Sequence, residues 1–192
     1  ALVILKLNDN KIKDLKAFSF KDLISLKELD LSSNMIRSFD YRAFWGTNLE
    51  SLYLGRNFIK IIPESKPFPV SLVNLDLSEN PFGILSNNIF LNLTSLRKVN
   101  FSLALKSVRF IREHFLETVS LESLILSENE LESLANFKIH ENLRYLDISG
   151  NKLKKLTNYF IDSLYNLERF NCSNNEVRII EEKAFSNLKY LG

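Results

Sequence analysis

The chain has 192 residues, of which 45% are hydrophobic and 25% are charged, and 25 Lys and Arg against 23 Asp and Glu leave a formal net charge of +2. This balance argues against a nucleic-acid partner, which needs clustered Lys and Arg. No hydrophobic run approaches the roughly 18 residues of a membrane-spanning helix, so a membrane tether is expected only outside this segment.

One pattern repeats along the whole chain. Its clearest copy, residues 26–36, reads L-x-x-L-x-L-x-x-N-x-I. By subtraction the copies are 22 to 25 residues apart, and they open at Leu2, Leu26, Leu49, Leu72, Leu96, Leu121, Leu143, Leu167 and Leu191. Periods of roughly 20–29 residues mark one class of solenoid. We therefore expect residues 1–192 to form a single solenoid of about eight coils, numbered 1 to 8 from these openings.

Both ends of the chain interrupt the repeat array. The sequence begins on the first copy and stops at Leu191 and Gly192, where a ninth copy opens. Repeat arrays need atypical terminal units to cover their exposed core, so we expect a fragment that lacks both caps. Residues 1–7 merge into coil 1 without a basic leading region, which favours a strand over a signal peptide.

Apolar and polar residues alternate through the L-x-L segment of each coil, which predicts a short strand. The apolar residues point inward and the residue between them points outward. The inward pairs are Leu5/Leu7, Leu29/Leu31, Leu52/Leu54, Leu75/Leu77, Val99/Phe101, Leu124/Leu126, Leu146/Ile148 and Phe170/Cys172. The expected fold is an α/β solenoid, a right-handed superhelix with a parallel concave sheet and an irregular or short-helical convex side.

An asparagine follows the strand in seven coils, at Asn10, Asn34, Asn57, Asn80, Asn129, Asn151 and Asn175. Its amide both donates and accepts, so it can satisfy backbone groups that would otherwise cost about 1–3 kcal/mol each. We expect a structural asparagine ladder. Coil 5 departs from the rule, because Ala104 stands in the ladder position; this coil is the longest and coil 6 the shortest. Sequence drift and a recognition irregularity both remain open explanations.

A phenylalanine recurs at one phase of the second half of every coil, at Phe20, Phe44, Phe68, Phe90, Phe115, Phe137, Phe160 and Phe185. Because a residue at a fixed phase in every coil faces the shared core, we expect these rings to pack there. In coil 3, Pro63, Pro67 and Pro69 favour an extended path, since proline fixes φ and restrains the residue before it.

The sequence carries no motif that predicts catalysis, a metal or a cofactor. His114 and His140 fall at different phases of neighbouring coils, which argues against a metal pair. Neither a glycine-rich phosphate loop nor a nucleophile elbow is present. Cys172, the single cysteine, takes an inward position and is expected to be a small buried hydrophobe. The expected protein is not an enzyme.

Outward positions around the strands form the surface on which we expect a ligand. Tyr and Arg are typical interface anchors. The residues expected to bind are Tyr53, Arg56, Arg97, Lys98, Ile125, Tyr145 and Arg169, and Leu103 is a further outward aliphatic side chain. The column after the opening Leu alternates in charge from Arg97 onward, and cross-strand pairing explains this without any partner.

Three segments fit the pattern of an N-glycosylation acceptor, beginning at Asn92, Asn100 and Asn171. Chance predicts about as many at this composition, so their number alone carries no weight. A glycan on Asn100 or Asn171 would obstruct the sheet. Asn92, in a turn on the opposite side, is therefore the expected site.

The pattern L-x-x-L-x-L-x-x-N-x-I-x-x-L-x-x-x-x-F-x-x-L, followed most closely by residues 2–23, 72–93 and 167–188, resembles the typical class of leucine-rich repeats. That class occurs mainly in extracellular animal proteins, including Toll-like receptor ectodomains and insect chaoptin-like or immune repeat proteins. The resemblance implies a secreted or membrane-tethered module that binds a protein, lipid or glycan through its concave or lateral surface. Whether it forms a homo- or heterodimer is left open by the sequence. The alternatives are an intracellular scaffold for protein assembly and the regulatory arm of an enzyme.

Overall fold

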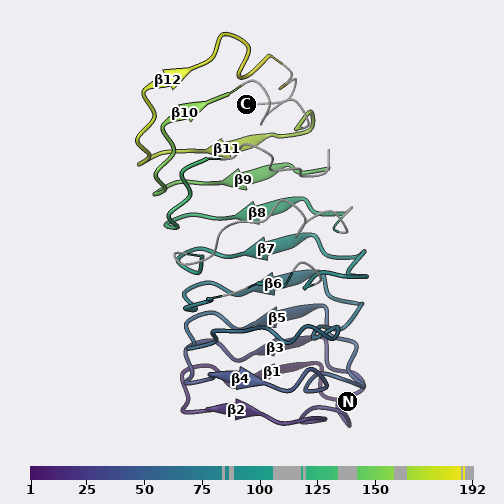
Figure 1. Ribbon diagram of the computed structural model, residues 1–192. Coiled ribbons are helices and arrows are strands. Elements are labelled where there is room, and N and C mark those ends of the chain that lie inside the picture. Colours follow the sequence, from purple (N-terminus) through teal and green to yellow (C-terminus); the bar gives the residue numbers. More distant parts are fainter. Residues whose placement is uncertain are drawn as a thin grey trace.

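The computed structural model shows a solenoid whose coils stack along one axis (Figure 1). The structure describes residues 1–83, 85, 86, 89–105, 118, 120–133, 142–157, 164–186 and 188. The expected core rings Phe115, Phe137 and Phe160 and the histidines His114 and His140 lie outside these residues.

Each coil contributes one short strand to an eight-stranded parallel sheet with the order β1-β3-β5-β6-β7-β8-β9-β11. The strands are β1 (Ile4–Lys6), β3 (Glu28–Asp30), β5 (Ser51–Tyr53), β6 (Asn74–Asp76), β7 (Lys98–Asn100), β8 (Ser123–Ile125), β9 (Tyr145–Asp147) and β11 (Arg169–Asn171). The repeats pair in phase, so that Leu29 lies opposite Leu5 on one side and Leu52 on the other. The prediction of one strand per coil, always running in the same direction, is confirmed.

Two small parallel sheets that the sequence analysis did not predict lie on the return path of the coils. They pair β2 (Asp14–Leu15) with β4 (Ser38–Phe39), and β10 (Lys155–Leu156) with β12 (Ile179–Ile180). Figure 1 shows the first pair near the N-terminal end and the second near the C-terminal end. The described part of the chain contains no helix, and its return segments, including the proline-rich segment of coil 3, are irregular outside these short strands.

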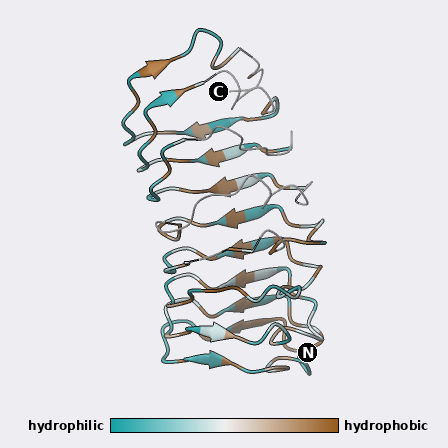
Figure 2. Cartoon of the chain, in the orientation of Figure 1, coloured by the Kyte–Doolittle hydropathy of each residue, from teal (hydrophilic) through white to brown (hydrophobic). Residues whose placement is uncertain are grey.

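The core lies between the main sheet and the return path. The inward residues Leu29, Leu31, Leu52 and Leu54 are fully buried, and Figure 2 shows hydrophobic residues recurring at the strands of successive coils. The rings of Phe20, Phe44, Phe68 and Phe90 are buried as well, whereas Phe185 in coil 8 is 39% exposed and contacts the Phe170 ring at a centroid distance of 6.5 Å.

The ladder asparagines join neighbouring coils through their side-chain amides. The Asn57 Nδ2 donates to the carbonyl oxygens of Leu54 and Gly55 in its own coil at 3.0 and 3.2 Å, and to that of Leu31 in the previous coil at 3.0 Å. Its Oδ1 accepts the N–H of Ile36, also in the previous coil, at 3.0 Å. The same pattern of contacts is made by Asn34, Asn80, Asn129, Asn151 and Asn175. Each amide therefore closes its own turn and fastens it to a neighbour.

The residue before each ladder position adopts a left-handed backbone conformation. It is Asp9, Ser33, Arg56, Glu79, Leu103, Glu128, Gly150 or Asn174, with φ between 51° and 65°. Its N–H donates to the next coil, as from Ser33 to the Gly55 carbonyl at 2.9 Å. The chain reverses sharply here, and an L side chain is disfavoured at this φ.

Replacing the ladder asparagine of coil 6 tests this account. The Asn129 Oδ1 accepts the N–H groups of Ala104 and Leu105, and its Nδ2 donates to three carbonyls, those of Phe101, Leu126 and Ser127. Because Asn129→Ala leaves these buried groups unpaired, we expect the free energy of unfolding to fall by about 1–3 kcal/mol, measured by chemical denaturation.

The matched control is Asn10→Ala, because the exposed Asn10 amide bonds only to carbonyls of its own coil, those of Leu7 and Asn8. A smaller loss is expected there. Equal losses at the two positions would contradict a role of the ladder in joining coils.

Candidate functional site

The outer surface of the eight-stranded sheet, which we call the sheet face, consists of two columns of outward side chains. The first column holds Ile4, Glu28, Ser51, Asn74, Lys98, Ser123, Tyr145 and Arg169, and the second holds Lys6, Asp30, Tyr53, Asp76, Asn100, Ile125, Asp147 and Asn171. Strands in a sheet lie about 4.8 Å apart, so neighbours within a column are in contact range. Five of the seven residues expected to bind a ligand lie on this face: Tyr53, Lys98, Ile125, Tyr145 and Arg169.

Most side chains of the second column have a structural task at the end of their strand. The Asp30 Oδ1 accepts the N–H of Ser32 at 2.9 Å and its hydroxyl at 2.6 Å. The same turn-capping contact to the residue two positions on is made by Asp76, Asn100, Asp147 and Asn171. Asp and Asn commonly close turns in this way. Five of the eight positions are therefore explained by the fold.

Tyr53 and Ile125 break this capping rule in the middle of the sheet. Neither side chain can make the carboxylate or amide contact. Two residues after Tyr53 stands Gly55, where coil 1 carries Asn8 and the other coils carry Ser. A Cβ on Gly55 would lie 2.8 Å from the Ser78 Oγ, so the close approach of coil 4 explains the glycine. No such packing reason accounts for a large half-buried ring or a branched aliphatic chain at the strand end. These two residues are the departures from the scaffold pattern.

A shallow depression of about 290 Å³ connects the two departures. Tyr53, Lys98 and Ile125 line it together with Asp76 and Asn100, which lie between them on β6 and β7. The depression therefore brings together three of the expected binding residues over four adjacent strands. It offers an aromatic ring, an aliphatic chain and an ammonium group on a floor of polar side chains.

Tyr145 and Arg169 form a second group on the same face. They lie opposite each other on β9 and β11, and the Arg169 guanidinium carbon is 5.7 Å from the centre of the Tyr145 ring, a cation–π distance. The Tyr145 hydroxyl donates to the Asp147 Oδ2 at 3.2 Å. Burial, with a further contribution from Asp147, raises the pKa of Tyr145 above its usual value. The phenol therefore stays protonated and remains a hydrogen-bond donor at neutral pH.

Arg56 and Arg97 lie at the two edges of the sheet face. Arg56 belongs to the turn after β5, and its Nε is 2.8 Å from the Glu79 Oε1. Arg97 precedes β7 and pairs with Glu122 at 2.5 Å. It lines a polar recess of about 300 Å³ with Glu122, Asn142 and Arg144. The sequence analysis placed both arginines on the binding surface of the sheet. The repeat gives the position of each residue within its coil, but it does not give the direction in which a long side chain extends.

The alternating charges before the strands form cross-strand ion pairs. Besides Arg97 and Glu122, the pairs are Lys27 with Glu50 at 2.7 Å and Arg144 with Glu168 at 2.5 Å. All are largely exposed, and exposed pairs contribute about 0–1 kcal/mol each. The interpretation that this column needs no partner is supported by these contacts.

The described residues can be compared with the requirements of a metal cluster, a reactive thiol and a membrane-spanning helix. They contain no cluster of His, Cys, Asp and Glu able to hold a metal ion. The Cys172 thiol is half-buried against the core, and burial raises its pKa, which disfavours the reactive thiolate. Within the same residues, no helix is long and apolar enough to cross a bilayer.

The three glycan acceptor segments differ in what their asparagines do. The Asn100 and Asn171 side chains cap turns on the sheet face, and the Asn171 Nδ2 also donates to the Asp147 Oδ2 at 3.2 Å. Asn92 is exposed, has a φ of 67° and lies in the return segment four residues before coil 5 opens. Only the Asn92 amide is presented outward without a hydrogen-bonding task in the described structure.

The capping assignment can be tested at Asp30. Asp30→Ala removes two hydrogen bonds to a partly buried turn, so we expect the free energy of unfolding to fall by about 1–3 kcal/mol. Lys6→Ala, at the same position of coil 1, removes no cap and should change it by less than about 0.5 kcal/mol. Thermal or chemical denaturation measures both. If Asp30→Ala were as mild as its control, the reason for singling out Tyr53 and Ile125 would disappear.

Osteomodulin and Toll-like receptor 3 are among the proteins that resemble this chain in sequence. Osteomodulin of Mus musculus is 30% identical over 186 residues, which cover 95% of this chain and 43% of osteomodulin. Toll-like receptor 3 of Homo sapiens is 29% identical over 189 residues, covering 87% of this chain and 21% of the receptor. The chain therefore spans less than half the length of these relatives.

Solved structures share the fold. The complex of TLR13 with ssRNA13 matches with a TM-score of 0.82 and 26% identity, covering 98% of this chain and 29% of that one. A chain in the octameric complex of Latrophilin 3, Unc5D and FLRT2 (LRR) matches with a TM-score of 0.88 and 24% identity, covering 98% and 59%. The second likeness concerns the fold alone.

The family pattern itself matches more than half of the chain. The Leucine rich repeat family matches residues 1–59 and 141–191. These ranges contain β1 to β5 at one end of the solenoid and β9 to β12 at the other. Together with the in-phase parallel sheet and the asparagine ladder, this match shows that the chain belongs to the leucine-rich repeat family.

Proposed function

We propose that this chain is the non-enzymatic recognition module of an extracellular protein and that it binds a protein partner on the sheet face, centred on Tyr53, Lys98 and Ile125. The main support for the proposal is that Tyr53 and Ile125 cap no turn. Asp76, Asn100 and Asp147, their neighbours in the second column of the sheet face, each do so. Tyr53 and Ile125 line one depression with Lys98. Tyr side chains are enriched among residues that dominate binding energy.

The chemistry of the sheet face favours a protein over RNA or lipid. Its two columns hold three cations and four carboxylates, so it lacks the positive excess that nucleic acid requires. A lipid chain needs a largely apolar enclosure, whereas Asp76, Asn100 and Lys98 line the depression. The depression combines polar side chains with the aromatic ring of Tyr53 and the aliphatic side chain of Ile125. Protein interfaces have the same composition, with an apolar centre and a polar rim.

Two observations support an extracellular location over an intracellular scaffold. One relative is a receptor by name, Toll-like receptor 3. The exposed Asn92 also presents an acceptor segment away from the sheet face, where a glycan would leave the proposed binding surface open.

Alanine variants on the sheet face test the binding surface. The wild-type chain is screened against an array of purified extracellular domains, and the partner found is titrated against Tyr53→Ala and Ile125→Ala. Because anchor residues contribute about 1.4 kcal/mol or more, each variant should weaken the affinity at least about tenfold.

The control is Val70→Ala, which alters a side chain that is 64% exposed and lies on the return path of coil 3. Its affinity should equal that of the wild type, and denaturation curves verify that all variants are folded. Unchanged affinity for both sheet-face variants would refute the proposed surface.

Glycan occupancy tests whether Asn92 is an accessible acceptor, which is one of the two supports for an extracellular location. When the chain is expressed through the secretory pathway of animal cells, we expect mass spectrometry to find an N-glycan on Asn92 and to lose it in Asn92→Gln. Asn100→Gln serves as the control and should leave the total glycan mass unchanged, since Asn100 caps a turn on the sheet face. An unmodified Asn92 in the secreted chain would remove this support for an extracellular protein.

A further inference from the structure

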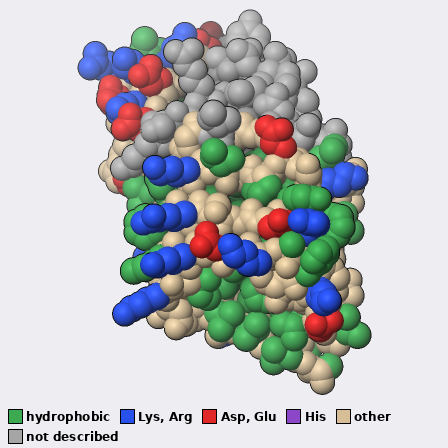
Figure 3. Space-filling model, turned by 60° about the horizontal axis from the view of Figure 1, so that its bottom comes forward, with side chains coloured by type: hydrophobic (Ala, Val, Ile, Leu, Met, Phe, Trp, Pro, Cys, Tyr) green, Lys and Arg blue, Asp and Glu red, His purple; other side chains and the backbone are tan. Residues whose placement is uncertain are grey.

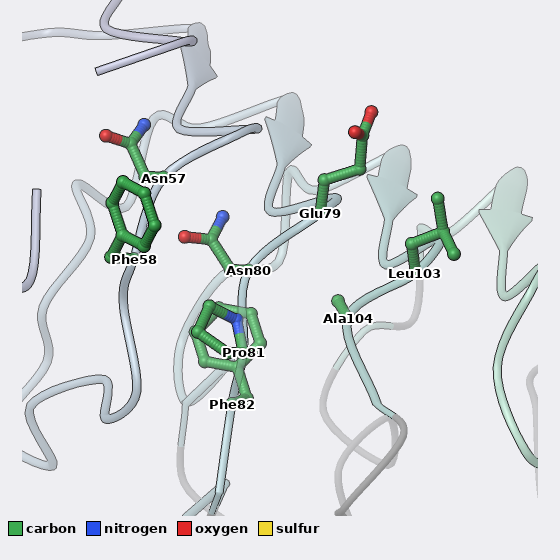
Figure 4. A pocket seen from close by; sticks show the side chains of 8 residues that line it. All are labelled: Asn57, Phe58, Glu79, Asn80, Pro81, Phe82, Leu103 and Ala104. Carbon is green, nitrogen blue, oxygen red and sulfur yellow. The ribbon is translucent and has the colours of Figure 1, made fainter. Parts of the chain in front are cut away.

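The asparagine ladder is interrupted between coils 4 and 5. In the preceding interfaces an asparagine of one coil accepts an N–H of the coil before it, as Asn80 does from Ile59 at 3.0 Å. Ala104 has no amide to offer, and the Phe82 N–H donates instead to the Asn80 carbonyl at 3.0 Å. Figure 4 shows the amides of Asn57 and Asn80 in matching orientations and only a methyl group at Ala104 in the corresponding place.

A recess of about 570 Å³ opens where the ladder is interrupted. Its floor includes the buried Phe82 and Ala104, and its mouth carries three exposed apolar side chains, Phe58, Pro81 and Leu103. Phe58 is 54% exposed and Leu103 38%. The recess lies beyond the ends of the strands and is separate from the sheet face (Figure 4). It is large enough to receive one bulky apolar side chain.

Leu103 occupies a backbone position that does not favour it. Its φ is 54°, in the left-handed region, where Gly150 and Asn174 stand in coils 7 and 8. Glycine and asparagine tolerate this conformation, and a bulky aliphatic residue is an outlier there. An asparagine side chain can offset the cost of this conformation with a local hydrogen bond, and the Leu103 side chain cannot form one. What it contributes is an apolar wall for the recess.

The charges on either side of the recess have opposite signs. In each coil, three positions surround the ladder position: the residue directly before it, the residue directly after it and the residue three positions after it. We call the exposed residues at these positions together the turn edge. In coils 1 to 4 the turn edge holds the cations Lys11, Lys13, Arg37, Arg56 and Lys60 and the carboxylates Asp9 and Glu79. In coil 6 it holds Glu128, Glu130 and Glu132, and in coil 7 it holds Lys152 and Lys154, of which Lys152 pairs with Glu130 at 2.9 Å. Lys and Arg side chains follow one another along the left edge of Figure 3, the side toward which the main strands run in Figure 1.

We propose that the turn edge is a second docking site, which receives an extended protein segment with one bulky apolar side chain between an acidic and a basic flank. The apolar side chain enters the recess between Phe58 and Leu103. The acidic flank lies along coils 1 to 3, and the basic flank lies along coil 6. The segment therefore runs along the solenoid axis in one direction only.

The dimensions agree with such a segment. Coils 3 and 6 are three strand spacings apart, about 15 Å at about 4.8 Å per strand. An extended chain covers that distance in about five residues at about 3.3 Å each. An anchor with charged residues two or three positions away on each side would reach Lys60 on one side and Glu128 on the other.

Selection from a random nonamer phage library tests the proposal without assuming a partner. The library is panned on the immobilised wild-type chain, and enriched peptides are sequenced, synthesised and titrated. We expect a shared bulky apolar residue with acidic residues on one flank and basic residues on the other. Ala104→Asn should fill the recess with a ladder amide and weaken these peptides at least tenfold. Phe58→Ser should weaken them to a similar extent.

The controls distinguish this site from the sheet face and from unfolding. Ala104→Asn can restore a ladder contact, so its resistance to denaturation should match or exceed that of the wild type while peptide binding is lost. Ile61→Ser, at a 62% exposed position of the same coil, and Tyr53→Ala should bind the peptides as the wild type does. No enrichment, a consensus without the two charged flanks, or full affinity for Ala104→Asn would each overturn the proposal.

Discussion

Each coil of this solenoid must turn sharply at the end of a buried strand, where carbonyl and N–H groups have no access to water. The ladder asparagines resolve this constraint, since one amide such as that of Asn57 satisfies groups in its own turn and in the coil before it. The same amide therefore stabilises a turn and its contact with the neighbouring coil. The stability of the array depends on these contacts between neighbours, and residues near the strand ends have little freedom to change.

The constraint divides the surface into positions that the scaffold explains and positions that it leaves free. Asp30 and its equivalents look like a polar ligand surface, yet their carboxylates and amides cap turns. The arginines at the edges look like anchors, yet Arg56 and Arg97 pair with Glu79 and Glu122 of the neighbouring coils. On the sheet face and the turn edge of the described chain, some large side chains make neither of these contacts. Tyr53 and Ile125 on the sheet face and Leu103 on the turn edge stand out for that reason.

Most of the fold could be predicted from the repeat period. A fixed spacing of leucines and asparagines determines which residues face inward and which strands pair, so the sheet and its register could be predicted. The pairs β2 with β4 and β10 with β12 could not, because two-residue strands on the return path leave no apolar alternation to detect. The candidate site was harder. The repeat period places Tyr53 and Arg56 close together in the same coil. Only the structure shows that Tyr53 lies on the sheet face, whereas the Arg56 side chain reaches Glu79 at its edge.

The turn caps could have been found in the sequence, since Asp or Asn precedes Ser by two residues in five coils. With that spacing read as a signal for a turn cap, Tyr53 and Ile125 could have been identified from the sequence as the two central positions that lack a capping Asp or Asn. Both candidate surfaces then fall on coils 3 to 6, where the ladder is interrupted at Ala104. A repeat array that gives up a joining contact in its middle weakens the interface on which its other coils depend. Stability alone would favour asparagine at every turn, and natural proteins tolerate such losses as long as they stay above their stability threshold. Under the proposal for the turn edge, the gap at Ala104 is retained because the altered coils present it to another molecule.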